Sequence, residues 1–241
     1  RKFIKIEKQK LISLINMYSL HKKKCHVGNL KVSNSKLTFQ NFGNLSLRIN
    51  DDIFVIKPSG VNLKKVNYRD YPIISIKRKR FNYKLKPSVD TDFHQEVYKN
   101  FKNINSIVHT HSKYATIWAQ ACKSIPNQGT THSDYWLNDI PITKRLSKKK
   151  IIKNYEKNIG IEIVKVLKKK FSYGVLIANH GVITFGRNVD EVISYAERLE
   201  YIAEMAFKTN MLIKNDKSLI SKDLKEKHYF RKHGNKSYYG Q

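Results

Sequence analysis

Ile104-Asn105-Ser106-Ile107-Val108-His109-Thr110-His111-Ser112 is an apolar run that leads into two histidines spaced two positions apart. A short apolar run of this kind is typical of a buried β-strand. Because side chains alternate between the two faces of a strand, His109 and His111 lie on the same side of it. The sequence therefore predicts a strand whose end presents two imidazoles to one point.

Imidazole nitrogens are good ligands for a divalent metal such as zinc. His109 and His111 alone fit a hydrogen-bonded polar edge equally well. Two further residues favour a metal: Asp90, in Lys86-Pro87-Ser88-Val89-Asp90-Thr91, and His180, where an apolar strand meets a glycine turn. Three imidazoles and one carboxylate leave room for a water or substrate oxygen, whereas closed structural sites more often use thiolates. We therefore expect a Lewis-acid catalytic centre.

Length and composition favour one domain over residues 1–241, because single α/β domains commonly reach this size. The two cysteines, Cys25 and Cys122, stand in different settings, which indicates a reducing compartment. No apolar stretch reaches the length of a membrane span, and residues 1–18 lack the apolar core of a signal peptide. We therefore expect a cytoplasmic protein without a membrane partner.

The formal net charge is +28, from 47 Lys and Arg against 19 Asp and Glu. A charge of this size raises the possibility of nucleic-acid binding. The lysines, however, are spread over the whole chain and accompany abundant Ile and Asn, a pattern typical of a genome rich in A and T codons. We expect adhesion to polyanions at low salt, but no dedicated nucleic-acid partner.

Periodicity predicts an alternation of helices and strands, which is the α/β fold class. Asp90 or Thr91 is expected to cap one helix and Ser112 the next. Residues 129–136 are polar and aromatic without periodicity, as in a functional loop. The predicted helices cover residues 4–20, 91–101, 113–122, about 159–167 and 190–211, and the predicted strands cover 44–49, 53–56, 104–111 and a pair around 180.

Two of the predicted strands adjoin polar loops that contain glycine, at residues 41–44 and 57–60. These loops offer backbone N–H groups, the amide of Asn44, the hydroxyl of Ser59 and the ammonium of Lys57, which are the groups that bind a phosphate. Ordinary turns have the same composition, so spacing alone leaves both interpretations open. The chain has no Walker sequence and no dinucleotide glycine fingerprint, which argues against a nucleotide cofactor.

Several motifs together resemble the class II aldolase family, and within it the L-ribulose-5-phosphate 4-epimerases. The resemblance covers nearly the whole chain and implies a three-layer α/β/α domain with a central, largely antiparallel sheet. It also implies a four-fold homotetramer with active sites between adjacent subunits. The motifs are Gly43-Asn44-Leu45-Ser46, Lys57-Pro58-Ser59-Gly60-Val61, residues 108–120, Gly129-Thr130-Thr131-His132, Asn179-His180-Gly181 and Tyr238-Tyr239-Gly240-Gln241.

The resemblance also implies a role for each candidate residue. One divalent metal per subunit, usually zinc, is assigned to Asp90, His109, His111 and His180. The substrate phosphate is assigned to Asn44, Ser59, Gly60 and Ser88, with Lys57 nearby, and the acid/base residues contributed across the subunit boundary are Asp134 and Tyr239. The chain departs from the family pattern at Val89, where a second phosphate-binding serine is expected, and in a basic insertion before Gly43.

The reaction implied is the metal-dependent epimerisation of L-ribulose 5-phosphate to D-xylulose 5-phosphate. The inverted carbon is not next to the ketone, so its proton is not acidic and a carbon–carbon bond must break. Retro-aldol cleavage gives an enediolate of dihydroxyacetone and glycolaldehyde phosphate, and the aldehyde rotates before re-addition. The alternatives are a class II sugar-phosphate aldolase, in which a glutamate typically replaces Asp90, and a noncatalytic or nucleic-acid-binding protein with this fold.

Overall fold

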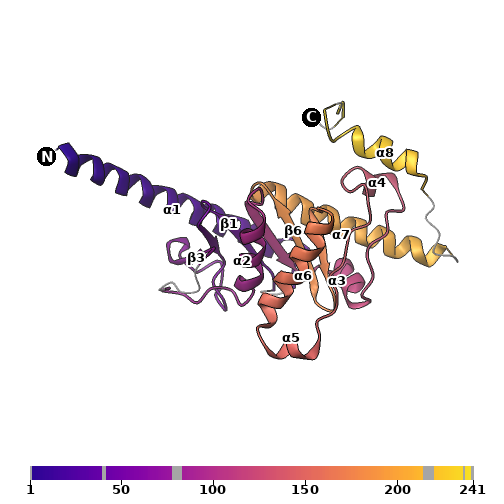
Figure 1. Ribbon diagram of the computed structural model, residues 1–241, viewed down its shortest axis with the longest axis horizontal. Coiled ribbons are helices and arrows are strands. Elements are labelled where there is room, and N and C mark those ends of the chain that lie inside the picture. The colour runs from indigo at the N-terminus through magenta and orange to yellow at the C-terminus, as the bar shows by residue number, and fades with distance from the viewer. Residues whose placement is uncertain (1, 40–41, 78–82, 214–219, 236, 240–241) are drawn as a thin grey trace.

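The computed structural model describes residues 2–39, 42–77, 83–213, 220–235 and 237–239 (Figure 1). Its centre is a six-stranded sheet with the strand order β3-β2-β1-β4-β6-β5, in which every neighbouring pair is antiparallel. The strands are β1 (Asn44–Arg48), β2 (Ile53–Ile56), β3 (Ile73–Ser75), β4 (Ser106–Thr110), β5 (Gly174–Ile177) and β6 (Gly181–Gly186). The helices are α1 (Lys2–Asn34), η1 (Tyr68–Asp70), α2 (Thr91–Asn100), α3 (Lys113–Gln120), α4 (Thr130–Ser133), α5 (Lys148–Ile152), α6 (Tyr155–Lys169), α7 (Val189–Leu212) and α8 (Lys222–Phe230).

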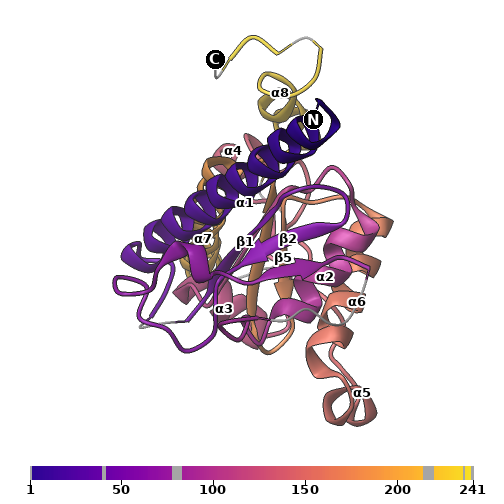
Figure 2. The same ribbon diagram turned by 90° about the vertical axis from the view of Figure 1, so that its left-hand side faces the viewer.

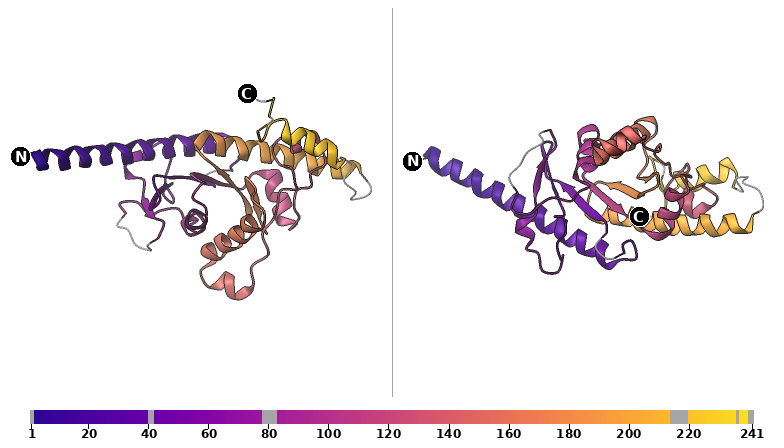
Figure 3. Two further views of the ribbon diagram at one scale, coloured as in Figure 1. Left: turned by 45° about the horizontal axis from the view of Figure 1, so that its top comes forward. Right: turned by 90° about the horizontal axis from the view of Figure 1, so that it is seen from below.

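The sheet has helices on both faces, which confirms the predicted α/β/α class (Figures 1 and 3). Alternate strand residues enter different cores, as the two-residue period of a strand requires. Ile107 packs on one face with residues of α2 and α6. Val108 packs on the other face with residues of α1 and α7. Next to that second core, α3 and α7 pack over β5 and β6.

Helix α1 is longer than the predicted helix of residues 4–20, because the basic segment that follows is also helical as far as Asn34. Its second half packs on the sheet, and the side chain of Asn29 exchanges two hydrogen bonds with the backbone of Leu45, at 2.8 Å and 3.0 Å. At Gly28 an added Cβ would lie 2.7 Å from Val189 and 2.9 Å from Leu45, so only glycine permits this approach. The first half of α1 projects from the body (Figures 1 and 3), and in Figure 2 the helix runs diagonally across the side that faces the viewer.

Two residues predicted to cap helices occupy the N-cap positions but make no capping hydrogen bond. Asp90 and Ser112 precede α2 and α3, yet neither side chain makes a capping hydrogen bond. The carboxylate of Asp90 is used elsewhere, as described below. Residues 130–133, expected to lie in an irregular loop, form the short helix α4. None of the described helices is long and apolar enough to cross a membrane.

Candidate functional site

Three histidines converge at one end of the sheet, as strand alternation predicts for the first two. Nε2 of His109 lies 3.1 Å from Nε2 of His111 and 3.2 Å from Nε2 of His180. His109 belongs to β4, His111 follows that strand, and His180 occupies the turn between β5 and β6. One ligand atom from each ring lies within 4.8 Å of the others, and we call these three residues the histidine triad.

The turn before β6 explains how His180 is placed. Asn179 has φ +60°, a left-handed conformation that asparagine tolerates better than most residues. Its backbone N–H donates to Ala119 and its side chain to Gln120, which fixes the turn against α3. At Gly181 an added Cβ would lie 2.7 Å from the carbonyl oxygen of Thr110. Only glycine therefore lets the turn approach β4 closely enough to complete the triad.

Hydrogen bonds at the outer ring nitrogens orient His109 and His180. Nδ1 of His109 donates to the carbonyl of Val182 at 2.9 Å, and Nδ1 of His180 lies 3.1 Å from the hydroxyl of Tyr155. A carbonyl only accepts, so a neutral His109 carries its proton on Nδ1 and a lone pair on Nε2. The Tyr155 hydroxyl can donate to His180 or accept from it, so both tautomers of His180 satisfy that contact. When the proton of His180 is on Nδ1, its Nε2 lone pair faces that of His109 across 3.2 Å, an arrangement that a bound cation stabilises.

The protonation states suit a metal. Burial, together with the neighbouring imidazoles, lowers the pKa of His109 to about 3 and that of His180 to about 4. Burial also lowers the pKa of His111, although the charge of Asp90 opposes this. All three rings are therefore neutral at pH 7, which is the form that binds metals.

The dimensions of the triad also fit. In a tetrahedral zinc site with Zn–N bonds of about 2.0–2.1 Å, two ligand nitrogens lie about 3.3 Å apart. Two of the separations in the triad are 3.1 Å and 3.2 Å, and all its ligand atoms lie within 4.8 Å of one another. Three protein nitrogens leave room for a further ligand, either the carboxylate of Asp90 or a water or substrate oxygen. The residues present therefore fit a divalent metal.

Asp90 lies beside the triad and is engaged by another side chain. Its carboxylate accepts a 2.7 Å hydrogen bond from the amide of Asn44. Burial raises the pKa of Asp90, whereas the Asn44 hydrogen bond and the charges of His180, His111 and Lys57 act to lower it. The carboxylate is not part of the group of converging histidine nitrogens. Its role as a fourth ligand stays a prediction.

The structure brings the predicted phosphate-binding residues together. The segments 57–60 and 86–90 lie side by side, because Ser88 N–H donates to the carbonyl of Lys57 and Ser59 N–H to that of Lys86, both at 2.9 Å. Lys57 donates to the carbonyl of Gly43 at 2.7 Å. Asn44 is directly opposite His109 in the β1–β4 pairing, so these loops adjoin the triad. Lys57 and Ser88 are buried, and Ser59 and Gly60 are exposed.

Asp134 and Tyr239 form a separate cluster next to α8. Asp134 accepts hydrogen bonds from Arg231 at 2.9 Å and from His228 at 3.0 Å, and pairs with Lys232 at 3.2 Å. Burial acts to raise the pKa of Asp134, but these partners outweigh it and hold the pKa below its ordinary value. The guanidinium of Arg231 also lies 4.5 Å from the ring centre of Tyr239. Within the described residues, no hydrogen bond, ion pair or ring contact connects this cluster to the triad, and Gly240 and Gln241 lie outside the description.

Sequence patterns did not reveal two neighbours of the triad. Tyr155 begins α6 and bonds to His180, and the ring of Phe42 lies 5.8 Å from that of His111. Neither residue has a spacing that links it to the histidines. The basic partners of Asp134 are visible in the sequence as a cluster of Arg and Lys near the C-terminus. Nothing in the sequence, however, indicates that this cluster pairs with a carboxylate almost a hundred residues earlier.

Comparisons with known proteins agree with this geometry. The profile of the "Class II Aldolase and Adducin N-terminal domain" matches residues 27–207. A solved L-fuculose 1-phosphate aldolase is 20% identical, with a TM-score of 0.74 over 88% of this chain and 95% of its own. YgbL from Klebsiella pneumoniae, a putative aldolase/epimerase/decarboxylase, is 20% identical, with a TM-score of 0.66 over 87% of this chain and 98% of its own. An L-fuculose-1-phosphate aldolase from Thermus thermophilus is 17% identical, with a TM-score of 0.62 over 78% of this chain and 95% of its own.

At these identities the solved structures demonstrate a shared fold, while the profile covers most of the chain, including β1, β4 and β6, which hold the triad and its neighbours. The chain therefore belongs to the class II aldolase and adducin family.

Proposed function

We propose that the protein is a divalent-metal enzyme that converts L-ribulose 5-phosphate to D-xylulose 5-phosphate by breaking and re-forming one carbon–carbon bond. The observation that carries the proposal is the triad, in which Nε2 of His109 lies 3.1 Å from Nε2 of His111 and 3.2 Å from Nε2 of His180. Zinc is the metal we favour, with Asp90 as the fourth protein ligand. When bound, the metal would act as a Lewis acid that stabilises negative charge developing on the substrate oxygens.

The loops beside the triad are assigned to the substrate phosphate. Ser59 and Gly60 are exposed and offer a hydroxyl and a backbone N–H. Ser88 and Lys57 lie directly behind them, tied together by the 2.9 Å bond from Ser88 N–H to the carbonyl of Lys57. A phosphate held here lies next to Asn44, and through the β1–β4 pairing next to His109. The rest of the sugar then extends toward the triad.

Proton transfer is assigned to Asp134 and Tyr239 of an adjacent subunit in a homotetramer. In one chain these residues share Arg231 and have no contact with the triad among the described residues, which supports a role at a neighbouring site. Tyr239 is 54% exposed and so available to a partner subunit. One group removes the hydroxyl proton during cleavage, and the other restores it after the aldehyde has rotated.

A sugar-phosphate aldolase is the second candidate, favoured by the names of the similar structures, which include L-fuculose 1-phosphate aldolase. Both reactions begin with the same cleavage, but an aldolase releases the fragments. The short carboxylate of Asp90, held by Asn44 at 2.7 Å, suits a fixed ligand better than a mobile base. This contact favours the epimerase.

The test incubates zinc-loaded protein with L-ribulose 5-phosphate and, in parallel, with L-fuculose 1-phosphate. With L-ribulose 5-phosphate, formation of xylulose 5-phosphate supports the epimerase, and release of free dihydroxyacetone and glycolaldehyde phosphate supports the aldolase. Cleavage of L-fuculose 1-phosphate also supports the aldolase. His111→Ala serves as the inactive control because it removes one triad nitrogen. If neither substrate is converted under conditions in which metal is bound, the proposal is wrong.

A further inference from the structure

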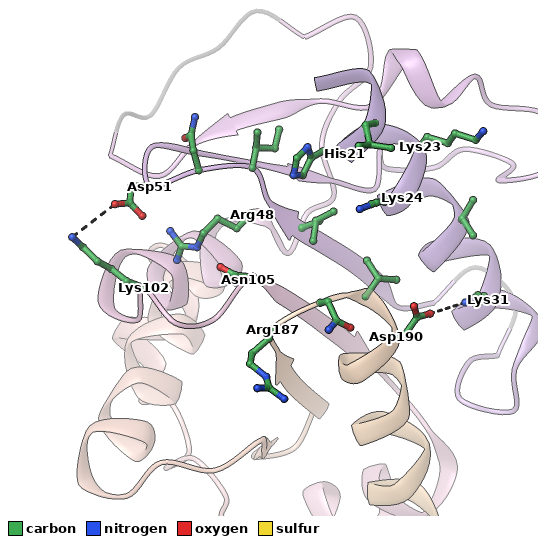
Figure 4. Close-up of a pocket in the computed structure, with 17 residues that line it drawn as sticks. His21, Lys23, Lys24, Lys31, Arg48, Asp51, Lys102, Asn105, Arg187 and Asp190 are labelled. Carbon is green, nitrogen blue, oxygen red and sulfur yellow. Dashed lines mark hydrogen bonds and ion pairs between the residues drawn. The ribbon is translucent and has the colours of Figure 1, made fainter. Parts of the chain in front are cut away.

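A groove of about 720 Å³ lies at the opposite end of β1 and β4 from the histidine triad (Figure 4). Asn44 and His109 are paired at the triad end of these antiparallel strands. At the other end, Arg48 N–H donates to the carbonyl of Asn105 at 2.7 Å, and both residues line the groove. Helix α1 and the start of α7 form its other walls. The groove is therefore distinct from the proposed active site.

The lining of the groove carries more cations than carboxylates. Two lysines are paired, Lys31 with Asp190 at 2.7 Å and Lys102 with Asp51 at 3.9 Å. Lys24 also lines the groove and makes no ion pair with any described residue. The groove begins at the N-terminus of the 24-residue helix α7, whose dipole adds partial positive charge. The electrostatic balance favours an anion.

Arg48 provides the fixed part of such a site. Its residue is only 7% exposed, and no carboxylate forms a salt bridge with it among the described residues. Nε donates to Ile104 O, and Nη2 donates to Tyr98 O and Phe101 O, all at 2.9 Å. Nη1 makes no hydrogen bond with a described residue. The charge of Asp51 acts on Arg48 without forming an ion pair. The two N–H groups of Nη1 are therefore the part of the guanidinium that can donate to a phosphate or a carboxylate.

The rest of the lining restricts the ligand further. Leu47, Ile49 and Val189 contribute aliphatic surface, and the described lining contains no Phe, Tyr or Trp on which a nucleobase could stack. The volume lies within the range of about 300–1,000 Å³ that is usual for small-molecule sites. These features fit a small molecule with an anionic group and an aliphatic part.

We propose that this groove binds a small organic anion, with its phosphate or carboxylate at Arg48 and Lys24 and its aliphatic part on Leu47, Ile49 and Val189. Figure 4 shows Lys24, Arg48 and Asn105 around the hollow. The proposal is independent of the reaction assigned to the triad. None of its residues belongs to the triad or to the segments 57–60 and 86–90 assigned to the substrate phosphate.

The test titrates the metal-loaded, full-length protein with four probes by calorimetry at physiological salt: hexyl phosphate, hexanoate, inorganic phosphate and hexanol. Hexyl phosphate or hexanoate should bind more tightly than inorganic phosphate, and hexanol should give no signal. The tighter of the first two identifies the preferred anionic group. Because Lys24 is exposed, Lys24→Ala should weaken binding about threefold to tenfold.

Two control variants localise the binding. Lys168→Ala makes the same charge change at the exposed end of α6 and should leave affinity unchanged. Ser59→Ala, in the proposed phosphate loop, should also leave it unchanged, so failure here is distinct from failure of the proposed function. Arg48→Lys keeps the charge but removes the Nη1 donors and the hydrogen bonds that fix the guanidinium, and should weaken binding of hexyl phosphate about tenfold in protein shown to be folded.

Equal affinity in wild type and Lys24→Ala would overturn the proposal, as would binding that Ser59→Ala abolishes. Inorganic phosphate binding as tightly as hexyl phosphate would also contradict it, because the aliphatic surface would then have no role. If Arg48→Lys does not fold, the comparison of Lys24→Ala with Lys168→Ala decides alone.

Discussion

The amide of Asn44 donates a 2.7 Å hydrogen bond to the carboxylate of Asp90, and its own Oδ1 is buried without a hydrogen-bond partner among the described residues. This contact connects the first residue of β1 to the residue that precedes α2. It holds a carboxylate beside three neutral imidazoles. The unused oxygen is an acceptor that a substrate hydroxyl can satisfy, since a buried acceptor without a partner costs about 1–3 kcal/mol.

Replacing Asn44 by Ala should weaken metal binding. The Asn44 hydrogen bond lowers the pKa of Asp90 against the effect of burial, so its loss raises that pKa and frees the carboxylate to move. Outer hydrogen bonds of this kind contribute about tenfold to a hundredfold to metal affinity. Competition with a chelator measures the change, with Asn100→Ala on the exposed side of α2 as control. Unchanged affinity would show that Asp90 is not a ligand.

Replacing His111 by Ala should remove most of the metal. Wild-type protein is expected to hold about one divalent ion per chain, and two nitrogens retain it poorly. Elemental analysis after gel filtration measures the occupancy. The matched control is His26→Ala, which removes an imidazole of α1 that is hydrogen-bonded to Tyr71. This variant should keep its metal. Full occupancy in His111→Ala would refute the triad as the metal site.

Hybrid tetramers should show that Asp134 and Tyr239 act from a neighbouring chain. When His111→Ala and Tyr239→Phe chains are co-expressed, about a quarter of the sites in a mixed ring pair an intact triad with an intact neighbour, and activity returns. Co-expressing Asp134→Asn with Tyr239→Phe should restore nothing, because one neighbour supplies both groups. Activity equal to the averaged parents in the first mixture would contradict the arrangement.

The ion pairs of Asp134 should stabilise the docking of α8 in a pH-dependent way. The pKa of Asp134 lies below its ordinary value, so its contribution to stability is complete above the unfolded-state pKa, about 3.9, and disappears as the pH falls through the folded-state value. Urea unfolding should therefore show Asp134→Asn clearly less stable than wild type at pH 7. The difference should shrink below about pH 4.

Asp223→Asn, an exposed carboxylate on the same helix, is the control for this measurement and should differ little from wild type at either pH. A constant difference between wild type and Asp134→Asn over the whole pH range would mean that the ion pairs do not carry the effect.

Replacing Val89 by Ser should improve substrate binding. Val89 is 69% exposed beside the phosphate loops, so the smaller side chain disturbs no packing. A hydrogen bond to a charged group contributes roughly 1.5–3 kcal/mol, which corresponds to about one to two powers of ten in affinity. KM for L-ribulose 5-phosphate should fall at physiological salt, while kcat stays nearly constant. Val89→Thr should show part of the gain, and Val89→Ala none.

Local patterns predicted the parts of the molecule that depend on local rules. Strand alternation placed His109 and His111 on one side of β4. Helical periodicity located α2 and α7 close to their observed limits and α6 without its first turn. Motif resemblance supplied the antiparallel sheet, whose strand order depends on contacts between segments far apart in the chain. Those contacts have no periodicity that a single sequence reveals.

Side-chain competition explains what the patterns missed. Asp90 was expected to cap α2 or to bind metal. Its hydrogen bond with Asn44 was not predicted, because this contact depends on how β1 and α2 pack. The helix through Asn34 was unexpected because Lys22, Lys23 and Lys24 resemble a solvated loop, whereas Cys25 and Asn29 behind them are buried against the sheet. Charge alone does not distinguish an exposed helix face from a linker.

The fastening of α1 at Asn29 has a consequence for the part of the helix that projects. An isolated helix must form its first turn at a large entropic cost, and short ones are marginal in water. In this protein the turns around Cys25 and Asn29 are held by tertiary contacts with β1. These turns therefore act as a preformed nucleus from which the projecting half of α1 propagates. Turns of α1 that lie far from these contacts can unwind and re-form quickly, while β1 and the triad beside it keep their geometry.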